Sequence, residues 1–222
     1  DFREADLFGA NFFSATLAGA DLRGSRLRAT DLTRASLEGA DLREGTLMKM
    51  GGESGSEIVV SDLSMCSLDG ANMRSANLKN ANMNRCTAVG AELQGAMLEG
   101  VQLQGSNLQG ANLSGATLCG TNFSGSEMGG CDLSGANMER AVLEDANLRG
   151  AVLPDAIVRH GKLGRANLKS TDTRNVDFAS ADIRDAEFAK PVSALDTDIR
   201  RALEMHEAWV DSFGNEGVLA DL

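Results

Sequence analysis

Two histidines and four cysteines are the side chains of this sequence best suited to acid–base, nucleophilic or metal chemistry. A metal site needs three or four converging ligands, but His160 and His206 are widely separated along the chain. No cysteine follows another at the Cys-x-x-Cys spacing typical of zinc and redox sites. We therefore expect no metal, no cofactor and no catalytic residue.

The acidic residues are numerous, but many of them recur at multiples of five positions, as Asp21, Asp31 and Asp41 do. A general acid–base pair needs two carboxylates held in one pocket, whereas a regular series indicates a repeating structure. The sequence also lacks a phosphate-binding loop, a nucleophile elbow and a calcium-binding loop. These observations predict a protein that is not an enzyme.

The formal net charge of -11 narrows the class of partner. Nucleic-acid backbones and anionic membrane surfaces both attract basic patches, so we expect neither as a direct partner, whereas a protein partner remains compatible. No apolar run is long enough to span a bilayer. The first residues do not form a signal peptide and already lie within the repeat described next, so the N-terminus looks trimmed. We expect a cytoplasmic location.

A five-residue period runs through most of the chain. A large apolar residue, the centre of each unit, recurs from Phe2 through Leu47 and again from Ile58 through Phe188. Two positions before the centre stands a small residue, and one position before it stands Asp or Asn in many units. Alternate residues of an extended chain point the same way, so the small and the large residue face inward together. The period therefore predicts a coil with a corner every five residues.

The units Ala71-Asn72-Met73, Ala76-Asn77-Leu78 and Ala81-Asn82-Met83 carry a specific resemblance. Over residues 1–190 the sequence resembles the pentapeptide-repeat family, with its pattern Ala-(Asp/Asn)-Leu-x-x. The resemblance implies an all-β fold, a right-handed quadrilateral β-helix. A low-complexity polar chain is the alternative, and the strict apolar period argues against it.

Three cysteines, Cys66, Cys86 and Cys131, stand at the small inward position, where a thiol replaces alanine readily. Cys66 and Cys86 are one coil apart, so a disulfide is conceivable, although packing as reduced thiols is favoured. Cys119 follows a centre directly and is expected to be exposed.

The register is interrupted between Leu47 and Ile58. We expect a first solenoid block over 1–47, a Gly/Ser-rich loop over 48–57, and a second block over 58–190 that continues the same β-helix. The loop is either a tolerated insertion or a partner contact through Met48, Lys49, Met50 and Glu53. Some gyrase-protecting members of the family that the sequence resembles carry such a loop.

From Gly90 to Gly135, every unit has a glycine at the second position after its centre. A type II turn needs positive φ at its third residue, which glycine adopts freely. This stretch is therefore expected to turn its corners as type II turns and to differ there from the rest of the coil.

A helix is expected over 191–217, because the five-residue period gives way to a helical one after Pro191. It either caps the open end of the solenoid or forms a homodimer contact, as the resemblance to gyrase-protecting proteins implies. The candidate contact residues are Ile199, Leu203, His206, Trp209, Val210 and Phe213. The motif Ala220-Asp221-Leu222 suggests that 218–222 begins further repeats.

Two functions fit these features. The first is a non-enzymatic structural or protein-interaction scaffold built on the rigid coil, with an unidentified protein partner. The alternative, drawn from the resemblance, is a DNA-mimicking inhibitor or protector of a type II topoisomerase such as gyrase. A continuous acidic stripe with a helix dimer favours mimicry, whereas mixed charges on a monomer favour the scaffold.

Overall fold

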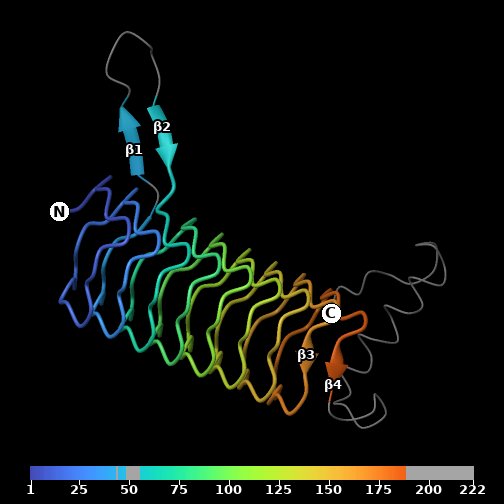
Figure 1. Cartoon of the computed structure of the whole chain (residues 1–222). Coiled ribbons are helices and arrows are strands. Elements are labelled where there is room, and N and C mark those ends of the chain that lie inside the picture. The colour runs from blue at the N-terminus through green and yellow to red at the C-terminus, as the bar shows by residue number, and fades with distance from the viewer. Residues whose placement is uncertain (44, 49–55, 189–222) are drawn as a thin grey trace.

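The described chain is a column of stacked square coils (Figure 1). The computed structural model describes residues 1–43, 45–48 and 56–188. The coils run from the N-terminus at one end of the column to β3 (Asn167–Leu168) and β4 (Glu187–Phe188) at the other. The five-residue period therefore builds one solenoid over most of these residues.

Each side of a coil pairs in parallel with the same side of the next coil, twenty residues further along. Asp6 pairs with Arg26, and Asn112 with Asp132, while β3 and β4 form the same parallel contact near the last described coil. The sides are called I to IV below and are defined by the centres Leu103, Leu108, Leu113 and Leu118, in that order. Only one or two residues of each side are extended, so most of the ladder consists of single bridges between short segments.

The interior is filled by the two inward positions of every unit. From Leu22 to Leu168, every described centre exposes at most 2% of its surface. The small partners, such as Ala111 and Ala136, are equally buried. At several polar small positions the hydroxyl finds a backbone acceptor: Ser106 Oγ donates to Met83 O at 2.8 Å, and Thr121 Oγ1 to Leu98 O at 2.7 Å. The narrow square thus buries small polar groups at low cost.

The corners between sides share one backbone geometry. The carbonyl of each centre accepts from the N–H three residues later, as Leu113 O does from Ala116 N at 3.0 Å. The residue before that N–H has positive φ at every described corner, including residues as large as Arg85, with φ 58°, and Met65, with φ 61°. This combination defines a type II turn. The expectation that the glycine stretch 90–135 differs in turn type is therefore wrong: its corners are the same turn made without the cost of a side chain in this region.

A β-hairpin interrupts the coil near its N-terminal end (Figure 1). β1 (Gly45–Met48) pairs antiparallel with β2 (Ser56–Val59), and Thr46 lies opposite Ile58. The parallel ladder continues from Arg26 directly to Asp62. Leu47 and Ile58 were expected to be solenoid centres, but their backbones belong to the hairpin. Leu42 is the last buried centre before the hairpin and Leu63 is the first after it, so the interruption is longer than the sequence pattern indicated.

The expected helix over 191–217 and the expected repeat start over 218–222 lie outside the described residues. Within the described ranges, no helix is long and apolar enough to cross a membrane.

Two buried hydroxyls provide a test of the interior. Ser25 Oγ is buried without a hydrogen-bond partner among the described residues, whereas Ser106 Oγ donates to Met83 O. Because a buried unpaired hydroxyl is costly, Ser25→Ala should raise the free energy of unfolding by about 1 kcal/mol, and Ser106→Ala should lower it by about 1 kcal/mol. Urea unfolding followed by circular dichroism measures both. Equal losses of unfolding free energy in the two variants would contradict the difference in hydrogen bonding between the two hydroxyls.

Candidate functional site

The chemistry-bearing side chains do not converge within the described residues. No group of three His, Cys, Asp or Glu side chains there has the arrangement of a metal site. His160 lies exposed at a corner, where its backbone φ is 54°. His206 falls outside the described residues.

The four cysteines are free thiols. Cys66, Cys86 and Cys131 are buried, as their inward position predicted. Cys66 Sγ donates to Leu27 O at 2.6 Å, and Cys131 Sγ to Leu108 O at 2.9 Å. Burial raises the pKa of the Cys66 and Cys131 thiols to about 12 and that of Cys86 to about 11. These three thiols pack the interior like alanine and are poor nucleophiles.

Thiol labelling tests this assignment. Cys119 is half-buried at a corner, so it alone should react measurably with Ellman's reagent at pH 8 in the folded protein, slowly because burial also raises the pKa of its thiol. All four thiols should react in denaturant. Cys119→Ser is the matched control and should abolish the reaction of the folded protein. Fast labelling of the Cys119→Ser variant under native conditions would contradict the burial of the other thiols.

The acidic and amide side chains before the centres have a structural role that the sequence reasoning missed. Asn112 Oδ1 accepts from Ser114 N at 3.0 Å, and Asp132 Oδ1 accepts from Ser134 N at 3.0 Å. Where Asp or Asn stands before a centre in this way, the Asx turn supplies an acceptor for the outward N–H that follows that centre. The two-residue spacing between an Asp or Asn and the N–H that it meets, repeated along the chain, was the available signal.

Near the N-terminal end, a row of ion pairs runs along side IV beside the hairpin. Arg23 donates to Asp21 from Nε at 2.8 Å and from Nη2 at 2.7 Å. Arg43 makes the same bidentate contact with Asp41. The Arg23 guanidinium also lies 3.7 Å from Asp41 on the next coil. The hydrogen bond from the Arg23 side chain lowers the pKa of Asp21 to about 2, against the opposing effect of partial burial.

The Asp21–Arg23 pair predicts a pH dependence. The pKa of Asp21 is lower in the folded protein than in the unfolded chain, so its contribution to stability is present above about pH 4 and is lost as the pH falls toward 2. Arg23→Gln should raise the pKa of Asp21 toward its ordinary value, as measured by carbon-13 NMR titration. Arg26→Gln, which removes an exposed pair with Asp6, is the control and should leave Asp21 unchanged. An unaltered Asp21 pKa in Arg23→Gln would refute the assigned cause.

The charges outside this row are mixed rather than continuous. Side IV carries Asp21 and Asp41 but then Asn77, Met97 and Thr117 in successive coils. Side I alternates in sign, because Arg26 stands between Asp6 and Asp62. Within the described residues, none of the four sides presents an unbroken row of carboxylates. The acidic stripe that DNA mimicry would use is therefore not found on this part of the surface.

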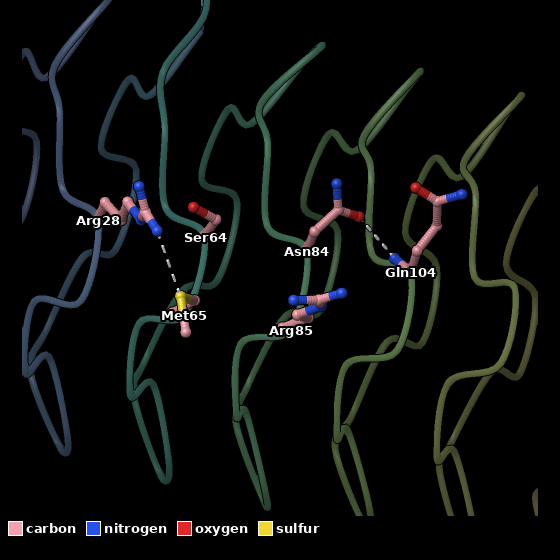
Figure 2. Close-up of a pocket in the computed structure, with 6 residues that line it drawn as sticks. All are labelled: Arg28, Ser64, Met65, Asn84, Arg85 and Gln104. Atoms are coloured by element: carbon pink, nitrogen blue, oxygen red, sulfur yellow. Dashed lines mark hydrogen bonds between the residues drawn. The ribbon is translucent and has the colours of Figure 1, made fainter.

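One depression lies at the corner between sides I and II (Figure 2). It has a volume of about 470 Å³. Arg28 points toward Met65, with Nη2 3.8 Å from Sδ, and Asn84 Oδ1 accepts from Gln104 N at 2.8 Å. Residues from four successive coils line it: Arg28, Ser64, Met65, Asn84, Arg85 and Gln104. It is open and polar, with no titratable pair suited to catalysis among its lining residues.

The candidate contacts expected from the sequence cannot be placed on this surface. The backbone of Met48 is in β1, whereas Lys49, Met50 and Glu53 lie outside the described residues. The six helix positions, Ile199, Leu203, His206, Trp209, Val210 and Phe213, also lie outside them. These positions stay predictions.

Comparison with known sequences supplies the context for this surface. The family model described as pentapeptide repeats matches in eight copies, over residues 10–47, 66–105, 89–125, 98–135 and 126–163. These matches cover more than half of the chain. No curated protein matches.

Several solved structures are similar to the chain. HetL, a pentapeptide repeat protein involved in heterocyst differentiation regulation in the cyanobacterium Nostoc, is 28% identical, with 83% of this chain and 85% of that chain covered and a TM-score of 0.25. QnrB1, a plasmid-mediated fluoroquinolone resistance protein, is 17% identical, with 93% and 88% covered and a TM-score of 0.40. A protein of the Arabidopsis thaliana thylakoid lumen is 24% identical, with 61% and 77% covered and a TM-score of 0.34.

Proposed function

This chain belongs to the pentapeptide-repeat family, and on that premise we propose that it is a non-enzymatic scaffold that binds another protein on the outside of its coil. The observation that carries the proposal is the filled interior, where every described centre from Leu22 to Leu168 is buried. Ligand sites are normally concave cavities, and a filled coil of this width leaves only its outer surface for recognition. A hydrogen-bonded ladder along the whole described column keeps that surface rigid, which favours binding by limiting the entropy lost.

The alternative is a DNA-mimicking inhibitor or protector of gyrase. The charge distribution on the described residues argues against it, because the acidic residues are interspersed with arginine and many serve the Asx turns. Mimicry of a duplex needs a continuous run of negative charge. The scaffold is therefore the preferred proposal.

The same proposal includes a right-handed coil, a C-terminal helix over 191–217 that caps it or joins two copies, and a cytoplasmic location. The family resemblance supports the handedness, and the helical period of the sequence supports the helix. The four unbridged thiols fit a reducing compartment.

Site-specific photo-crosslinking in cells tests the scaffold. A photoreactive amino acid placed at one exposed residue per corner samples every side: Gln104, Gln109, Ser75 and Asn80. We expect a discrete protein adduct from one corner or from two adjacent corners, because a rigid surface binds a partner on one face. The opposite corners serve as internal controls. Absence of any protein adduct from all four corners would refute the proposal.

A DNA supercoiling assay with purified gyrase separates the two functions. We expect micromolar protein neither to inhibit supercoiling nor to protect gyrase from a fluoroquinolone. Inhibition or protection would instead establish the alternative.

A further inference from the structure

Three arginines near the N-terminal end differ from most others in the described chain. Arg28, Arg34 and Arg85 form no ion pair within the described residues, whereas Arg3, Arg23, Arg26 and Arg43 each contact a carboxylate. Arg28 and Arg85 line the depression between sides I and II, and Arg34 lies at the opposite corner of side II. All three are exposed. Their guanidinium groups are therefore exposed and unpaired within the described residues.

The most exposed large hydrophobic side chains lie on the same two corners, one at each edge of side II. Phe8, Phe13 and Met65 expose 64%, 53% and 51% of their surfaces, the three largest values among the exposed large hydrophobics of the described residues. Phe8 and Met65 lie at the corner between sides I and II, and Phe13 at the corner between sides II and III. Together these six residues make a basic–apolar patch that flanks side II: Phe8, Phe13, Arg28, Arg34, Met65 and Arg85. Grouped exposed apolar residues commonly mark an interaction site.

The nearby acids do not neutralise this patch by direct pairing. Asp31 Oδ1 accepts from Thr33 N at 3.0 Å, and Asp69 Oδ1 accepts from Val89 N at 2.8 Å. Both carboxylates thus serve the backbone, and no ion pair joins either to a patch arginine within the described residues. The guanidinium groups remain available for a carboxylate from outside, which they bind in a bidentate manner.

We propose that the basic–apolar patch binds an extended acidic segment of a partner protein that also carries apolar side chains. This inference rests on the proposed scaffold function and adds the chemistry of its partner. A carboxylate of the segment sits between Arg28 and Arg85, whose corner positions lie on coils two stacking steps apart. Its apolar side chains cover Phe8, Phe13 and Met65. At about 4.8 Å per coil the patch is about 15 Å long, which about five extended residues span.

A defined peptide tests the patch. The probe is a fluorescein-labelled peptide of about ten residues that alternates Glu with Leu and Phe, and the comparison peptide carries Lys in place of Glu. We expect the full chain to bind the acidic peptide at least about tenfold more tightly than the basic one, measured by fluorescence anisotropy. Equal affinity for the two peptides would overturn the proposal.

Charge reversal at the patch supplies the matched variants. The double variant Arg28→Glu/Arg85→Glu should weaken binding of the acidic peptide at least about tenfold. Arg149→Glu/Lys162→Glu makes the same charge change at exposed residues that form no ion pair within the described chain, and it should change the affinity less than about twofold. Circular dichroism checks that both variants fold. Retained affinity in the Arg28→Glu/Arg85→Glu variant would overturn the proposal.

Two further outcomes separate this inference from its alternatives. A duplex DNA of about twenty base pairs should bind no more tightly than the basic peptide, and binding that exceeds the acidic peptide would replace the protein segment by a nucleic acid as the occupant. If the Arg28→Glu/Arg85→Glu variant keeps its photo-crosslinked partner in cells, the patch assignment fails while the scaffold function stands.

Discussion

The corner is the constraint on which the described structure depends. A hydrogen bond from the centre carbonyl to the N–H three residues later closes each turn, and positive φ at the residue between them sets its direction. Because the turn repeats every five residues, the chain returns to the same side after twenty residues and meets itself in register. The inward pair, the outward acceptor and the exposed corner residues all take their places from this one geometry. Since large residues such as Arg85 and Met65 also adopt positive φ there, the stacked backbone enforces the turn even where the side chain disfavours it.

The sequence predicts the repeating part of this architecture well, because the apolar period reflects burial directly. The inward thiols Cys66, Cys86 and Cys131 were placed correctly for the same reason. The hairpin was bounded incorrectly, since Leu47 and Ile58 keep an apolar character that fits a solenoid centre and a hairpin strand equally. The turn type was restricted incorrectly because glycine at 90–135 shows only where the turn is easy. A local preference cannot reveal a conformation that the neighbouring coils impose.

Net charge proves a weak guide to the partner of such a protein. Several acidic side chains serve the backbone, because they accept from the N–H that follows their own centre, as Asp132 does. Others are held in pairs, as Asp21 is by Arg23. The informative charges are those left over once these roles are assigned. On the described surface they include the arginines on the two corners of side II that also carry exposed phenylalanines, which the overall net charge of -11 conceals. The basic–apolar patch could not be found from the sequence, because the extent of the hairpin decides which residues before it stack on those after it, as Arg26 does on Asp62.

The hairpin shows how the solenoid accommodates a segment that does not follow the five-residue repeat. The chain leaves the column after Arg43 and forms β1 and β2. It then returns to the column, where Asp62 pairs with Arg26 as it would in an uninterrupted coil. A corner can therefore accept an insertion. Any segment whose two ends lie at strand spacing can be inserted there without shifting the coils on either side. Such a segment can be lengthened, exchanged or deleted in evolution without changes in the rest of the solenoid. New recognition elements can therefore be gained while the five-residue register of the coils stays the same.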